Sequence, residues 1–92
     1  MKRIELWISG KVQGVAFRAS LARFVLEQEF QVNGYVKNLP DGRVYVILEG
    51  NQAEIKKIEA WCQHGPPVAK VEHVKRVELA QEAPLLRFHI RN

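Results

Sequence analysis

An arginine follows a short glycine-containing turn near the start of the chain. Residues 10–18 read GKVQGVAFR, and the two glycines allow backbone conformations in which consecutive amides point to one side. Such a turn before a helix can hold an anion, because the first helical N–H groups are unpaired and the helix dipole is positive there. The positive charge of Arg18 is unfavourable beside the positive end of the helix dipole. A bound phosphate that contacts the planar guanidinium would offset this repulsion. From spacing alone, a solvated arginine beside an ordinary turn fits equally well.

A second candidate side chain, Asn38, stands where an alternating apolar segment meets a turn. The side-chain amide of an asparagine offers a carbonyl oxygen that can accept a hydrogen bond from a ligand or a water molecule. Asparagines near hairpins commonly bond to their own backbone instead, and residue type alone favours that interpretation.

Other nucleophiles and metal ligands are poorly supported. The chain has three histidines that are far apart in the sequence, namely His64, His73 and His89. No Cys/His or paired-carboxylate spacing predicts a metal site. Cys62 falls on the apolar face of an expected helix, where a buried hydrophobe is favoured over a nucleophile. We therefore expect no metal, no cofactor and no covalent catalysis.

The hydrophobic pattern predicts the elements that would position these residues. Alternation predicts strands over 4–8, 32–38, 44–48, 71–79 and 86–90, the last two separated by a polar stretch over 81–84. Helical spacing predicts two helices, one from Phe17 and one capped by Asn51 and stopped by the Gly-Pro-Pro at 65–67. Turn residues at 39–42 join two strands into a hairpin. This order predicts an α+β, ferredoxin-like βαββαβ fold, with two helices on one face of an antiparallel sheet and a short C-terminal strand.

Length and composition predict one globular domain over 1–92. The chain has 92 residues, of which 47% are hydrophobic and 26% charged. A single cysteine forms no intramolecular disulfide, and no long apolar run marks a leader or a membrane span, so a cytoplasmic protein without a membrane partner is expected. The net charge is +4, but the basic residues are scattered from Lys2 to Arg91 and favour no particular anion.

Two long motifs resemble those of the acylphosphatase family. Residues 8–18 (ISGKVQGVAFR) resemble the first motif and residues 34–44 (GYVKNLPDGRV) the second. The resemblance continues through 65–71 (GPPVAKV) and 88–90 (FHI), so it spans nearly the whole chain.

The resemblance implies a metal-independent hydrolase that cleaves acyl phosphates to a carboxylate and inorganic phosphate. Arg18 would bind the phosphoryl group, and Asn38 would orient the attacking water. The phosphate-binding loop would comprise Val12, Gln13, Gly14, Val15 and Ala16. The expected partners are a small acyl phosphate as substrate and phosphate or a similar anion as product or inhibitor; we expect a monomer and no nucleic-acid partner.

Two other functions share this topology. Alternation places Trp7, Tyr35 and Tyr45 as exposed aromatics on the sheet face away from the core, as in RNA-recognition domains, but the basic-glycine-aromatic run of such domains is absent. A non-catalytic anion-sensing module is the other alternative.

Three residues depart from the family pattern. Ala16 stands where glycine is frequent, and its methyl group would narrow the cradle if the position needs a positive φ. Gln31 stands where glycine often ends the first helix, and Tyr45 replaces a commonly acidic residue.

Overall fold

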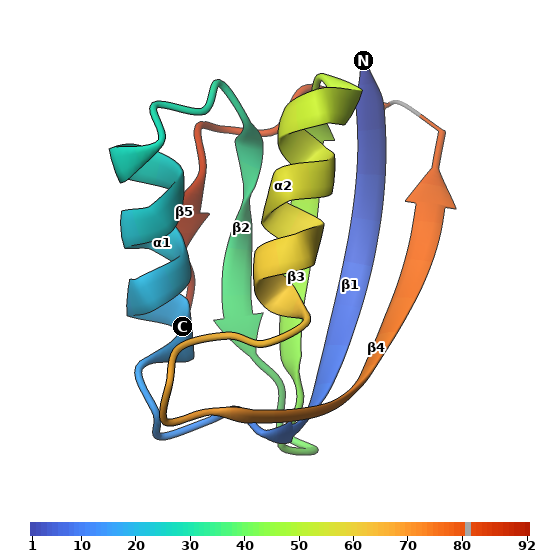
Figure 1. Ribbon diagram of the computed structural model, residues 1–92. Coiled ribbons are helices and arrows are strands. Elements are labelled where there is room, and N and C mark those ends of the chain that lie inside the picture. The colour runs from blue at the N-terminus through green and yellow to red at the C-terminus, as the bar shows by residue number, and fades with distance from the viewer. Residues whose placement is uncertain (81) are drawn as a thin grey trace.

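The computed structural model describes residues 1–80 and 82–92 as a sheet with two helices on one face (Figure 1). The helices are α1 (Phe17–Glu27) and α2 (Gln52–Cys62). The strands are β1 (Lys2–Lys11), β2 (Asn33–Asn38), β3 (Val44–Gly50), β4 (Lys70–Leu79) and β5 (His89–Ile90). The described part of the chain therefore has the α+β, ferredoxin-like arrangement that the hydrophobic pattern predicts. No helix in these two ranges is long and apolar enough to cross a membrane.

The sheet order is β4-β1-β3-β2-β5. The pairings of β1 with β3, β1 with β4 and β2 with β3 are antiparallel, whereas β5 runs parallel to β2. The sheet is thus mixed, and the prediction of an antiparallel sheet holds for its first four strands only. Hydrophobic alternation predicts which face a side chain takes but not the direction of its partner strand.

The core lies between the sheet and the helices. Every second residue of the central strands is buried beneath them, as Ile4, Leu6 and Ile8 are in β1. The helices contribute residues at helical spacing, namely Phe17, Leu21, Val25, Ile55, Ile58 and Cys62. Asn51 caps α2 as predicted, since its Oδ1 accepts a hydrogen bond from the Glu54 amide at 2.8 Å.

The ends of two elements differ from the sequence pattern. The strand predicted over 86–90 is ordered as a ladder only at His89–Ile90, with one isolated bridge between Asn33 and Arg87. Helix α1 ends at Glu27, and Glu29, not the Gln31 position where the family often has glycine, adopts the left-handed φ of 56° that follows the helix. The polar stretch predicted over 81–84 includes Gln81, which lies outside the described residues.

The three aromatic residues lie on the face without helices, but they are not exposed as expected. Tyr45 is buried, and Trp7 and Tyr35 are half-buried. Tyr45 packs edge-on against Trp7 with ring centroids 5.3 Å apart, and the amino group of Lys37 lies 5.6 Å from the Tyr45 ring. Neighbouring long side chains cover these rings.

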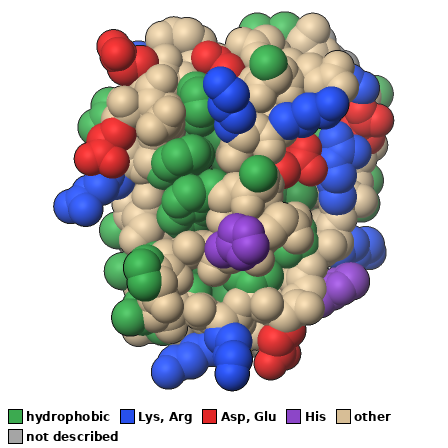
Figure 2. Space-filling view, in the orientation of Figure 1, with side chains coloured by type: hydrophobic (Ala, Val, Ile, Leu, Met, Phe, Trp, Pro, Cys, Tyr) green, Lys and Arg blue, Asp and Glu red, His purple; other side chains and the backbone are tan. Residues whose placement is uncertain are grey.

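A buried ion pair occupies the same face at the other end of the sheet. Arg3 Nε donates to Glu49 Oε1 at 3.0 Å, and its Nη2 bonds the same oxygen and the Ala83 carbonyl, the latter at 2.7 Å. Both side chains are only about a twentieth exposed (6% and 5%), so their charges rely on protein partners instead of water. The opposite, helix-covered face carries acidic and basic side chains interspersed, with no single basic block (Figure 2).

Candidate active site

The loop between β1 and α1 is anchored by two buried valines. Val12 and Val15 point into the core, with 1% and 8% of their surface exposed. Gly14 and Ala16 alternate with them, are exposed, and both adopt a left-handed backbone, with φ of 74° and 61°. The two apolar anchors therefore hold a turn in which Gly14 and Ala16 face solvent. Ala16 does adopt the positive φ that its sequence position made a concern, and it is one of the residues that line the cavity described below.

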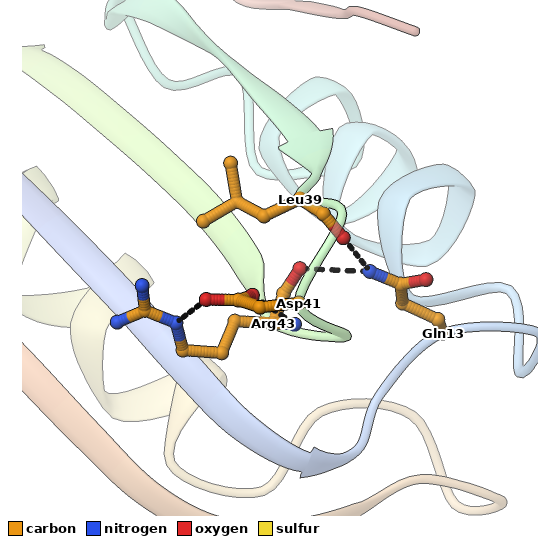
Figure 3. Close-up of polar contacts among 4 residues, drawn as sticks. All are labelled: Gln13, Leu39, Asp41 and Arg43. Carbon is orange, nitrogen blue, oxygen red and sulfur yellow. Dashed lines mark hydrogen bonds and ion pairs between the residues drawn. The ribbon is translucent and has the colours of Figure 1, made fainter.

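Gln13 ties this loop to the β2–β3 hairpin (Figure 3). Its Nε2 donates to the carbonyls of Leu39 and Arg43, at 2.8 and 2.9 Å. The hairpin turn is itself braced by Asp41, whose side chain accepts from the Arg43 amide at 3.0 Å and from Arg43 Nε at 2.8 Å. The amide of Arg43 lowers the pKa of the Asp41 carboxyl, as does its side chain. Gln13 thus fixes the loop relative to the end of β2, where Asn38 lies.

Arg18 lies in the first turn of α1. The helix begins after Ala16, which provides no side-chain cap, and no acidic residue occupies its first turn. The first N–H groups of a helix have no acceptor within it, so this terminus is open to an anion. Arg18 Nη1 donates to the Arg91 carbonyl at 3.1 Å and to Asn92 Oδ1 at 3.2 Å. Its Nε and Nη2 make no hydrogen bond within residues 1–80 and 82–92, so this edge of the guanidinium can receive an oxyanion.

A cavity of about 200 Å³ brings Arg18 and Asn38 together. Val12, Gly14 and Ala16 of the predicted phosphate-binding loop also line it, whereas Gln13 and Val15 do not. The remaining lining residues are Phe17, Ala19 and Ile90. The Asn38 side chain makes no hydrogen bond with any described residue, so the backbone-capping interpretation of this asparagine is not what the structure has. The cavity is smaller than typical drug-sized sites, which favours a small ligand.

The other candidate groups lie elsewhere. Burial raises the pKa of the Cys62 thiol far above its ordinary value and leaves it fully enclosed, which agrees with a packing role. His64 and His73 are exposed, and His89 contacts the Arg87 carbonyl through Nδ1 at 2.8 Å. No cluster of metal-ligating side chains occurs in the described ranges. A larger cavity, of about 390 Å³, lies at the C-terminal end of α1 and contains neither Arg18 nor Asn38.

Sequence reasoning missed the two supports of the site. The Gln13 side chain was assigned to the loop without its hairpin contacts, and Arg91 and Asn92 were not connected with Arg18. The hydrogen bonds of Gln13 and of Arg18 join residues that are 26 to 74 positions apart in the sequence. No local motif encodes contacts at such separations.

Comparison with known proteins identifies the family of the chain. The sequence model of the family described as Acylphosphatase matches residues 4–90. The acylphosphatase of Methylococcus capsulatus is 40% identical over 90 residues, which cover 98% of this chain and 96% of the relative. The structure of an acylphosphatase from Coxiella burnetii is similar with a TM-score of 0.86 and 36% identity, covering 98% of this chain and 92% of the other. The Bacillus subtilis acylphosphatase structure has a TM-score of 0.90 and 28% identity, with full coverage of both chains.

Proposed function

The chain belongs to the acylphosphatase family of enzymes, and on that premise we propose that it hydrolyses acyl phosphates with Arg18 and Asn38 as its catalytic residues. Arg18 binds the phosphoryl group together with backbone amides of the loop over 12–16, and Asn38 orients the attacking water. The products are a carboxylate and inorganic phosphate.

One observation carries the assignment of residues: the cavity of about 200 Å³ that Arg18 and Asn38 share with Gly14 and Ala16. The open Nε and Nη2 edge of Arg18 suits two phosphate oxygens, and the uncapped start of α1 adds unpaired amides. Phosphoryl transfer passes through a loose transition state, so positioning and charge stabilisation supply most of the catalysis. A carboxylate leaves readily, which makes a protein general acid unnecessary.

The lining of the cavity restricts how the proton of the water is handled. Among the described residues that line the cavity, Arg18 is the only one with an ionisable side chain, and a guanidinium carries donors but no acceptor for a proton. Asn38 can accept a hydrogen bond from water but is a poor base. We therefore propose that a phosphoryl oxygen of the substrate takes the proton. On this mechanism kcat is flat between about pH 6 and 9; a solvent-isotope effect together with a titrating protein group in that range would contradict it.

The test is hydrolysis of benzoyl phosphate in excess EDTA. Arg18→Ala and Asn38→Ala are compared with matched controls, Arg23→Ala on the exposed side of α1 and Asn33→Ala at the other end of β2. Folding of every variant is checked by circular dichroism. We expect turnover that needs no metal, a loss of about a hundredfold or more for each site variant, and near-wild-type rates for both controls.

Three other outcomes would each change the assignment of function or mechanism. An inactive wild-type protein that still binds inorganic phosphate in a calorimeter would favour the anion-sensing alternative. Full activity in folded Arg18→Ala or Asn38→Ala would remove that residue from the mechanism. Loss of turnover in EDTA that returns with added metal would contradict metal-independent hydrolysis.

A further inference from the structure

The Arg18 guanidinium is held from one side only. Its Nη1 donates to the Arg91 carbonyl and to Asn92 Oδ1, at 3.1 and 3.2 Å. A guanidinium carries five N–H donors in a rigid plane, so fixing Nη1 also fixes the direction of the Nε and Nη2 edge. The position of the Arg91 carbonyl therefore decides where that open edge points.

Arg91 is in turn attached to β2 by two contacts. Its amide donates to the Val36 carbonyl at 2.8 Å, which extends the parallel pairing of β5 with β2. Its guanidinium lies over the ring of Tyr35, with 4.1 Å between the guanidinium carbon and the ring centroid. This is the shortest cation-to-ring distance among the described residues; the others are 5.4 Å or more.

These contacts join the two faces of the sheet. Tyr35 belongs to the aromatic group on the face without helices, whereas Arg18 belongs to α1 on the other face. Arg91 follows the short edge strand β5 and reaches both, through its side chain on one face and its carbonyl on the other. Arg91 thus connects the aromatic face to the cavity, although the two lie on opposite sides of the sheet.

We propose that Tyr35 is a positioning residue for the reaction, which acts through Arg91 to orient the guanidinium of Arg18. The inference rests on the proposed function of Arg18. Tyr35 touches no substrate; its ring stacks beneath Arg91 and keeps the Arg91 carbonyl where it bonds Arg18 Nη1.

The size of the effect is bounded by the stack itself. The contact between Tyr35 and Arg91 can shift the orientation of the Arg18 guanidinium by no more than the free energy with which it holds Arg91. For an exposed cation-π contact, that free energy corresponds to about a two- to fivefold change in an equilibrium constant. The main-chain bond to Val36 remains when the ring is removed, so a partial and not a complete loss is expected.

The experiment measures the inhibition constant of inorganic phosphate and the KM and kcat for benzoyl phosphate. The variants are Tyr35→Ala, Tyr35→Phe, Arg91→Ala and the double variant Tyr35→Ala with Arg91→Ala. Lys37→Ala is the control, because its amino group also lies over the Tyr35 ring, at 5.9 Å, but does not contact Arg18. Urea unfolding of each variant separates stability from function.

We expect Tyr35→Ala to raise the phosphate inhibition constant and KM about two- to fivefold, with Tyr35→Phe and Lys37→Ala at wild-type values. The double variant should be no worse than Arg91→Ala alone, since the two residues act through one contact. A general loss of structure would lower kcat through the active fraction without moving the inhibition constant.

Two results would overturn the inference. One is an unchanged phosphate inhibition constant in Tyr35→Ala, and the other is full additivity in the double variant, which would mean that Arg91 acts only through its own charge. Because phosphate affinity is also measurable by calorimetry without turnover, failure of this inference is distinguishable from failure of the proposed hydrolysis, which would show as an inactive wild-type protein.

Discussion

Replacement of Ala16 by glycine will make the protein more stable. Ala16 precedes α1 with φ 61° and ψ 28°, a left-handed conformation that an L-residue other than glycine adopts at a cost. Its carbonyl accepts the first helical hydrogen bond, from the Ser20 amide at 2.9 Å, so the conformation is fixed by the start of the helix. The buried neighbours Val15 and Phe17 hold the chain on either side. The residue therefore cannot relax without moving the loop.

The magnitude follows from two opposing terms. The left-handed conformation costs alanine about 1–2 kcal/mol, which glycine avoids. Glycine loses more conformational freedom on folding, about 0.5–1 kcal/mol relative to alanine. The centres of the two ranges give a net gain of about 0.75 kcal/mol, which raises the Tm of a domain of this size by roughly 3–6 °C.

Urea unfolding at neutral pH, followed by tryptophan fluorescence, measures this difference. Ala22→Gly in the middle of α1 is the matched control, because the same change at a right-handed helical position should lower the free energy of unfolding by about 1 kcal/mol. Opposite signs for the two variants are expected. Equal destabilisation by both would refute the reasoning, since it would mean that the left-handed backbone at Ala16 carries no cost.

Three further changes have expected outcomes. Arg3→Met removes a partner from the buried Glu49 carboxylate and should lower the free energy of unfolding by about 3 kcal/mol in urea; a loss below about 1 kcal/mol would show that water reaches the pair. Asn51→Ala removes the α2 cap and should cost about 1 kcal/mol, with Asn51→Asp near wild type. Burial, together with the hydrogen bond to Glu5, raises the pKa of Tyr45 far above its ordinary value of 10.0. The unfolded chain thus loses this proton first, and the free energy of unfolding should fall as pH rises above 10; Tyr45→Phe should flatten that fall, and an unchanged slope would contradict the assignment.

The helices and the central hairpin were predictable because their signals are local. Helical spacing from Phe17, the cap at Asn51 and the turn residues over 39–42 each act within a few positions of the chain. The direction and length of β5 were not predictable, since its pairing with β2 depends on a contact more than fifty residues away in sequence.

Of the candidate site, too, the part with local sequence signals was predictable and the rest was not. Arg18 and Asn38 were singled out from two local motifs, and in the structure both line one cavity; their catalytic roles stay a prediction. The exposure of the aromatic face was mispredicted, because alternation assigns a face to Tyr45 but does not reveal that Trp7 and Lys37 cover it. The supports of the site, Gln13 and Arg91, depend on folded geometry that no spacing rule contains.

The place of β1 in the sheet has a consequence for synthesis of the protein. This first strand lies between β3 and β4, and its residue Arg3 pairs with Glu49 on one side and Leu79 on the other. At ribosomal rates of about 5–20 residues per second, β1 waits several seconds before its last partner leaves the exit tunnel. During that time β1 can pair with β3 only, and its other edge has no partner strand. An unpaired strand edge is a template for pairing with other chains, and folding should be slow for a chain of this size because the partners of β1 are so distant in sequence.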